Sequence, residues 1–266
     1  MATPALVCEA APRIAAIGPG FYFTDETIAV GREHGLDGFR FYFLGRGGVL
    51  GDVEADVVTS AFGYFTPALV SRMWTTARER TSLSARDAGR LYLRCSQEFG
   101  RRHLSEVAGL AEFCAAAEQV NDAADRAGLA LYAGTAAEPL VDDLPARAMQ
   151  LNTVLREFRG SAHLVAILAT PGITPRLAHG IRRPDFWTLF GYEERDLPVG
   201  TDAQRGALAT ADELTDALVA PAFDVLDEAG RVSLLDGLVA IEAALPEWVM
   251  PAARPRLLPG RGRLPK

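Results

Sequence analysis

Residues 157–167 carry the side chains of this chain that are best suited to chemistry. One small-residue helical turn there holds a carboxylate, a guanidinium and an imidazole, on Glu157, Arg159 and His163. Residues four apart share one face of a helix, so Arg159 and His163 would lie together. Gly160 leaves room beside them for a ligand or a second helix. The pattern favours proton transfer or stabilisation of an anion, without indicating which reaction.

If the chain is an enzyme, His163 is the candidate general acid or base, because the pKa of a free imidazole lies near neutrality. Glu157 would orient the imidazole or share the proton transfer. Arg159 or Arg46 would stabilise an enolate or a carboxylate. The structural alternative stays open: His163 would be a hydrogen-bonded helical histidine, while Glu157 and Arg159 would pair across a helix interface.

Aromatic residues in the N-terminal half are candidate walls of a small-molecule site. Combined with the polar group of Arg46 and those of residues 157–163, they form the mixture that ligand cavities tend to have. The alternative is that these rings belong to the hydrophobic core. The candidate substrate-binding residues are Tyr22, Phe39, Tyr42, Arg46, Tyr64 and Phe65.

Helical periodicity along nearly the whole chain predicts the elements that must position these residues. Capped helices are expected over residues 24–35, 84–100 and 105–128. Residues 38–48 are rich in Phe and Tyr and are expected to form a buried helix, with a strand as the alternative. The helix carrying residues 157–163 would begin with Pro145 in its first turn.

The predicted fold is all-α, a multi-helix bundle of two packed helical lobes with at most a vestigial winged-helix element. Residues 129–144 contain Gly, Pro and an acidic pair, which indicates a linker between the lobes. The expected domains are an N-terminal helical lobe over residues 1–135 and a C-terminal helical lobe over residues 143–250. A mobile tail is expected over residues 251–266.

The composition is that of a folded protein without a membrane span. Hydrophobic residues make up 49% of the 266 residues, and no apolar run reaches the roughly 18 residues that a spanning helix needs. The N-terminus has no basic segment before its apolar residues, so a cytoplasmic location is expected. Three distant cysteines predict buried, reduced thiols, and four scattered histidines predict no metal site.

Neither nucleic acid nor a cofactor is expected. The formal net charge is −7 and the isoelectric point is near 5.2, which would repel a phosphate backbone. No glycine-rich nucleotide motif follows a predicted strand, and Gly-Arg-Gly-Gly at residues 45–48 lacks the lysine of a phosphate-binding loop. The expected partner is a small-molecule ligand.

Two stretches resemble a family of uncharacterised actinobacterial proteins labelled helix-turn-helix family proteins. The first spans residues 21–70 and includes Phe-Tyr-Phe at 21–23, Gly-Phe at 38–39 and Gly-Arg at 45–46. The second is Leu-Arg-Glu-Phe-Arg-Gly-Ser-Ala-His at 155–163. The resemblance implies a winged-helix portion and an actinobacterial host.

The chain departs from the family pattern in two places. The family's second motif reads Arg-Glu-His-Arg-Gly-Asp-Gly-His, and Phe158, Ser161 and Ala162 replace its first His, its Asp and its second Gly. If the family binds a metal there, the two ligands kept here, a Glu and a His, are too few for a closed site. Residues 187–206, in the winged-helix portion, form a shortened stretch without a basic recognition helix, so the label implies little DNA binding.

These observations favour a small-molecule-binding, cofactor-independent tailoring enzyme that cyclises, isomerises or hydrates a largely apolar metabolite of specialised metabolism. The first alternative is a ligand-sensing transcriptional regulator, which needs a basic helix presented by a dimer, with residues 176–183 as the candidate. The second alternative is a non-catalytic helical interaction protein built on the closing helices expected over residues 210–227 and 230–245. A homodimer is compatible with all three.

Overall fold

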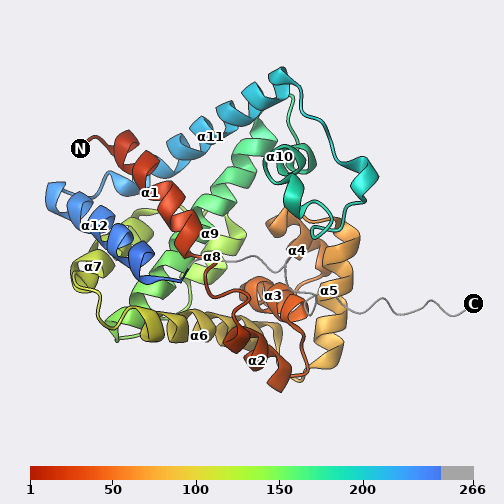
Figure 1. The fold of residues 1–266 in the computed structure, drawn as a ribbon, viewed down its shortest axis with the longest axis horizontal. Helices are drawn as coiled ribbons and strands as arrows, with labels where there is room; N and C mark the ends of the chain where they lie inside the picture. Colours follow the sequence, from red (N-terminus) through yellow and green to blue (C-terminus); the bar gives the residue numbers. More distant parts are fainter. Residues whose placement is uncertain (247–266) are drawn as a thin grey trace, which may run out of the picture.

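A computed structural model describes residues 1–246 and confirms the all-α prediction (Figure 1). Helix accounts for 72% of the structure, and the described residues contain no β-strand. The α-helices are α1 (Thr3–Ile17), α2 (Asp25–Glu33), α3 (Gly38–Gly47), α4 (Ala55–Phe62), α5 (Pro67–Arg80), α6 (Ala85–His103), α7 (Leu110–Ala123), α8 (Ala130–Ala136), α9 (Leu144–Ala169), α10 (Pro175–Arg182), α11 (Asp202–Phe223) and α12 (Glu228–Ala244). Three short 3-10 turns cover Gly48–Leu50, Pro184–Phe186 and Glu194–Asp196.

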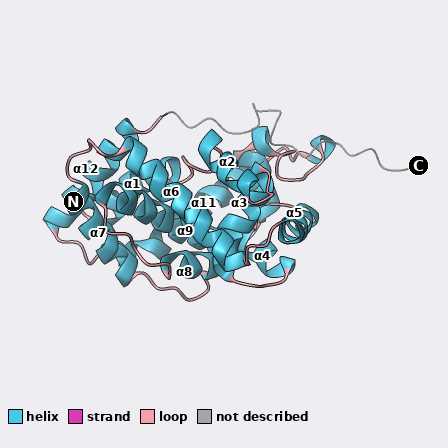
Figure 2. Cartoon of the chain, turned by 90° about the horizontal axis from the view of Figure 1, so that it is seen from below, coloured by secondary structure: helices cyan, strands magenta, loops and turns pink. Residues whose placement is uncertain are grey.

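The 26-residue helix α9 is the centre of the bundle. It packs against α1, α6, α7, α8, α10 and α11. Helices α1, α7 and α12 lie toward one end of the molecule, and α3, α4 and α5 lie toward the other (Figures 1 and 2). As predicted, Pro145 lies in the first turn of α9, where Asp143 accepts a hydrogen bond from the backbone N–H of Ala146.

One hydrophobic core runs through the bundle. Its fully buried members include Leu6 of α1, Phe43 of α3, Phe113 of α7, Leu151 of α9 and Leu238 of α12. The core therefore continues across the expected boundary between the two lobes, and the division into lobes stays a prediction. A second, smaller cluster joins the end of α9 to α10 and α11, through Ile167, Ile173, Ala178, Leu208 and Ala211.

Residues 129–144, predicted as the linker between the lobes, contain a helix. Helix α8 occupies part of this segment and buries Leu131 and Tyr132 against α9. The Tyr132 hydroxyl donates a hydrogen bond of 2.9 Å to Oδ1 of Asn121. A helix of seven residues spans barely two turns, too few for its hydrophobic period to emerge from the sequence.

Helix boundaries follow the predicted caps at some ends only. Thr24 and Ser84 cap α2 and α6 as predicted, and residues 38–47 form the predicted buried helix. Ser105 caps no helix, because α7 begins only after Gly109, whose positive φ of 76° ends the preceding turn. Helix α11 begins eight residues before the predicted position at 210, behind a capping box of Thr201 and Gln204.

Two expectations drawn from composition have separate outcomes. None of the helices described here is both long and apolar enough to cross a membrane. Cys95 and Cys114 are buried free thiols, but Cys8 is exposed, so the expectation was wrong for that residue. Leu6 and Val7 of the same helix turn toward the core, which places Cys8 on the outer face. The predicted tail over residues 251–266 lies outside the described residues.

Helices α3 and α6 approach each other through glycine. A Cβ atom on Gly48, at the end of α3, would lie 2.0 Å from the carbonyl oxygen of Ala85 and 2.9 Å from the backbone nitrogen of Gly89. Both neighbours are backbone atoms of α6, which cannot rotate away as a side chain can. Close packing of these backbones holds α3, and with it Tyr42 and Arg46, at a set distance from α6.

We expect Gly48→Ala to lower the free energy of unfolding by about 2–3 kcal/mol, because the added methyl group forces two backbones apart. Urea unfolding measures the change. Gly206→Ala on α11 is the matched control: a Cβ there meets nothing within 4 Å, so the protein should gain up to about 1 kcal/mol. Similar effects of the two substitutions would contradict this account of the α3–α6 contact.

Candidate functional site

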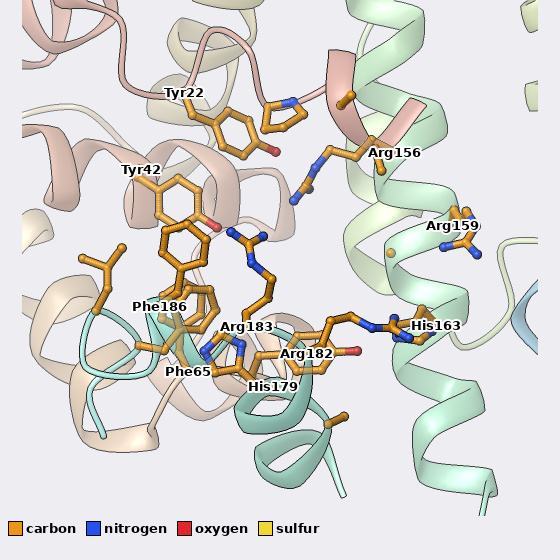
Figure 3. A pocket seen from close by; sticks show the side chains of 18 of the residues that line it. Tyr22, Tyr42, Phe65, Arg156, Arg159, His163, His179, Arg182, Arg183 and Phe186 are labelled. Carbon is orange, nitrogen blue, oxygen red and sulfur yellow. The ribbon is translucent and has the colours of Figure 1, made fainter. Parts of the chain in front are cut away.

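A cavity of about 700 Å³ lies where α9 and α10 face α3 and the loops after α1 and α4 (Figure 3). Its walls are mostly apolar, with polar groups from α9, α10 and the turn after α10. A volume of this size accommodates a small organic molecule. The aromatic residues of the wall include Tyr22, Phe39, Tyr42, Tyr64, Phe65 and Phe186.

Helix α9 supplies polar side chains to the cavity wall at a helical spacing. Arg156, Arg159 and His163 lie three or four residues apart along it, so they project from neighbouring turns. Figure 3 shows Arg156 pointing toward Tyr22 and Tyr42, whereas Arg159 turns away from them. Arg159 donates a hydrogen bond of 2.8 Å to Asp216 of α11.

Tyr64 and Phe65 reach the cavity from the turn that ends α4. Gly63 has a positive φ of 63°, and a Cβ there would lie 2.5 Å from a methyl carbon of Leu164 on α9. Glycine is therefore needed for both the conformation and the close approach. The turn places the ring of Phe65 in a parallel stack on Phe190, with centroids 3.9 Å apart.

Glu157 lies behind this wall, in a buried ion cluster. Its carboxylate accepts two hydrogen bonds of 2.8 Å from Arg46 and one of 2.7 Å from Arg156. The Tyr22 hydroxyl donates a further hydrogen bond of 3.2 Å. Burial alone would raise the pKa of Glu157, but the two guanidinium groups lower it to about 2. Glu157 is therefore a fixed anion at neutral pH.

His163 is a neutral imidazole at the cavity wall. Its Nδ1 lies 2.8 Å from the hydroxyl of Thr215, and its Nε2 lies 3.5 Å from a guanidinium nitrogen of Arg182. Burial and the charge of Arg182 lower the pKa of His163 to about 4. A free imidazole keeps its pKa near 6.5 because it has neither burial nor a neighbouring cation.

His179 of α10 is the second histidine of the cavity. Its ring stacks on Phe190, with centroids 4.0 Å apart, and burial lowers its pKa to about 4. Thr174 caps α10 by accepting a hydrogen bond from the backbone N–H of Leu177, which sets where the helix begins. His179 follows within its first two turns and faces the cavity.

The structure places most of the predicted site residues at one cavity. His163 and Arg159 line it, together with the predicted aromatic residues of the N-terminal half. Arg46 and Glu157 do not: they lie behind the wall, beside a much smaller hollow of about 20 Å³. Glu157 is hydrogen-bonded to arginines and Tyr22, and it does not contact His163. The catalytic and binding roles of the predicted residues stay predictions.

Sequence reasoning missed Arg156, His179, Arg183 and Phe186, which also line the cavity. Arg156 lies three residues before Arg159, and this spacing along α9 is the signal that could have added it. The residues at 179, 183 and 186 recur three or four apart, and this spacing is the signal that could have grouped them.

The basic segment 176–183 is not a free row of positive charge. Arg182 is paired with Asp212, and Arg183 lies 3.5 Å from Asp185. Arg176 lies over the rings of Trp187 and Tyr192. The expectation that nucleic acid is not a partner stays a prediction. Across residues 1–246, no three His, Cys, Asp or Glu side chains are grouped so that they could hold a metal ion.

A family model described as a helix-turn-helix family matches residues 9–250 of this chain. The chain belongs to this helix-turn-helix family. No curated protein and no solved structure matches it. The family match confirms the family that residues 21–70 and 155–163 resemble. Membership of the helix-turn-helix family does not identify a substrate, a reaction or a source organism.

Proposed function

We propose that this member of the helix-turn-helix family is a ligand-sensing regulator whose cavity binds a small, largely apolar organic molecule. The cavity of about 700 Å³ carries the proposal. Its walls combine aromatic faces with a few polar groups, the composition by which ligand sites fix the orientation of a bound molecule.

Unpartnered polar atoms support the proposal. The Tyr64 hydroxyl, Nε of Arg159 and Nε2 of His179 are buried and have no hydrogen-bond partner among the described residues. All three residues line the cavity. Buried polar groups in folded proteins nearly always have a partner. After a rotation of these side chains toward the cavity, polar groups of a ligand would supply the missing partners.

The family match supports regulation as the output of ligand binding. Helix α10 connects ligand binding to regulation. His179 and Arg182 line the cavity, while Arg176 on the same short helix lies against the following loop. A ligand that contacts α10 would therefore shift the segment that carries the exposed arginines. A homodimer, a cytoplasmic location and a role in specialised metabolism remain part of the proposal.

The second candidate function is the tailoring enzyme. One observation favours it: His163 holds a neutral imidazole at the cavity wall, and its low pKa leaves a nitrogen free of a proton at neutral pH. An imidazole in this state accepts a proton as a general base. The same low pKa makes it a weak base, and at neutral pH almost none of it carries the proton that a general acid donates.

Filling the cavity tests the binding proposal. Gly160 lies on the cavity wall, and a Cβ there meets nothing within 4 Å, so Gly160→Phe places a ring in the cavity with little steric cost to the fold. Compounds from an apolar metabolite library that raise the melting temperature of the wild type should lose at least about tenfold in affinity for this variant.

Gly206→Phe is the matched control, because Gly206 is an equally open helical glycine that does not line the cavity. The Gly206→Phe variant should bind the same compounds with the affinities of the wild type. Equal binding by wild type and Gly160→Phe would remove this cavity as the site. A gel shift that changes when the hit is added supports the regulator. Conversion of the hit, detected by mass spectrometry and lost in His163→Ala, supports the enzyme instead.

A further inference from the structure

We infer that the ligand is an organic monoanion, an aromatic or similarly apolar carboxylic acid, whose carboxylate binds Arg156. The inference rests on the proposed function, since it names the class of molecule that the same cavity takes. It depends on a count of charges around the wall of the cavity and on which of those charges a ligand can reach.

The buried cluster behind Tyr22 has one positive charge in excess. It contains two guanidinium groups, Arg46 and Arg156, and a single carboxylate, Glu157. Burial raises the pKa of Tyr22, so its hydroxyl stays neutral and does not balance the second guanidinium. No aspartate or glutamate is among the described residues that line the cavity. An unbalanced charge in a largely buried site is costly, and an anion beside it would lower that cost.

The excess charge is accessible at Arg156. Arg46 binds both oxygens of Glu157, whereas Arg156 contacts one oxygen and leaves its remaining donors free of that carboxylate. The exposed fraction of the side chain rises from 2% for Glu157 to 13% for Arg46 and 25% for Arg156. Of these three residues only Arg156 lines the large cavity, where it points toward Tyr22 and Tyr42 (Figure 3).

The other arginines of the cavity wall already face a carboxylate. Arg159 is paired with Asp216, Arg182 with Asp212, and Arg183 with Asp185 at 3.5 Å. These acids belong to α11 or to the turn after α10 and do not line the cavity. The cavity therefore offers one unmatched guanidinium, which favours a ligand with a single negative charge.

The surroundings of Arg156 select the body of that ligand. Its guanidinium lies 5.1 Å from the centroid of the Tyr22 ring. The rings of Phe23, Phe39 and Tyr42 form a stacked group beside the Tyr22 ring. Flat apolar surfaces next to one charged donor group suit an aryl carboxylate, which accepts charge-assisted hydrogen bonds from the guanidinium.

The test compares three probes with one aromatic body: naphthoate, neutral naphthamide and dianionic naphthyl phosphate. Isothermal titration calorimetry should show the wild type binding naphthoate about tenfold or more tighter than naphthamide, since hydrogen bonds to charged groups carry this much. Naphthyl phosphate should also bind more weakly than naphthoate, because only one guanidinium is unmatched and the second negative charge would have no partner. Arg156→Gln should bring the ratio of naphthoate to naphthamide affinity close to one. Arg156→Lys should restore part of the preference.

Arg156→Gln should fold, because Arg46 and Glu157 remain as a balanced pair, and circular dichroism checks this. Arg147→Gln removes the same charge from an arginine of α9 that is paired with Glu118 and does not line the cavity, and it should keep the preference for naphthoate. Equal affinity for naphthoate and naphthamide in the wild type would overturn the inference and leave the proposed function standing. Tighter binding of naphthyl phosphate than of naphthoate would overturn the inference that the ligand carries a single negative charge. Failure of all three probes to bind would count against both proposals.

Discussion

Replacing Glu157 with glutamine is expected to lower the free energy of unfolding by about 3–5 kcal/mol, the cost of breaking a buried ion pair from one side. The substitution keeps the size of the side chain and removes only its charge. Two guanidinium groups, Arg46 and Arg156, would then remain in the same buried space without a carboxylate. Urea unfolding, followed by circular dichroism at neutral pH, measures the loss.

A double-mutant cycle separates this effect from a general loss of packing. Arg46→Met combined with Glu157→Gln removes one charge of each sign, so the double variant should be more stable than Glu157→Gln alone. Asp216→Asn is the comparison at a more exposed pair: its partner Arg159 has a side chain 26% exposed, and the change should cost about 1 kcal/mol or less. A similar cost for Glu157→Gln would contradict the buried-cluster account.

The protein should lose on the order of 6 kcal/mol of stability between about pH 6.5 and pH 4, because two cavity histidines are held neutral. The pKa of His163 and that of His179 are lowered from 6.5 to about 4. Below pH 6.5 the unfolded chain binds protons at these residues and the folded chain does not. Their stabilising contribution is thus complete above pH 6.5 and disappears as the pH approaches 4.

Two other groups with lowered pKa values bear on this range. The pKa of Glu157 is lowered from 4.5 to about 2, so its contribution is lost only below about pH 4.5. Burial also lowers the pKa of His103, which adds a loss of the same sign. Urea unfolding at about pH 7.5 and about pH 5 gives the difference in stability.

His163→Gln and His179→Gln should each remove about half of that pH dependence, and the double variant most of it. A wild type that is equally stable at both pH values would show that these imidazoles are not held neutral. Addition of a bound ligand should raise stability at both pH values, by an amount set by its concentration relative to its dissociation constant.

Local sequence patterns determined most of the helices. Apolar residues recur with the helical period in long segments such as α6 and α9, and Thr24, Ser84 and Pro145 mark helix starts because their preference acts within one turn. Prediction failed where the local signal is short or ambiguous. Helix α8 is too short to show a period, and α7 starts at a turn made by Gly109 instead of at Ser105.

Part of the site was also predicted from neighbours within one helix. Spacing along α9 places Arg159 and His163 on neighbouring turns of one helix, and this grouping needs no tertiary structure. Glu157 lies on the same helix, but α3 decides its surroundings: Arg46 comes from 111 residues away to bind its carboxylate, so Glu157 is a buried counterion, and its catalytic role stays a prediction.

The sequence by itself therefore determined the helices and the one-helix group of polar residues, since both depend on neighbours within a few residues. The tertiary structure decided which faces meet. It brought Tyr64 and α10 over the end of α9, lowered the pKa of His163 by burial and by Arg182, and left Arg156 as the unmatched charge at the cavity. Burial and charge balance depend on residues far apart in the chain, so no local pattern specifies them.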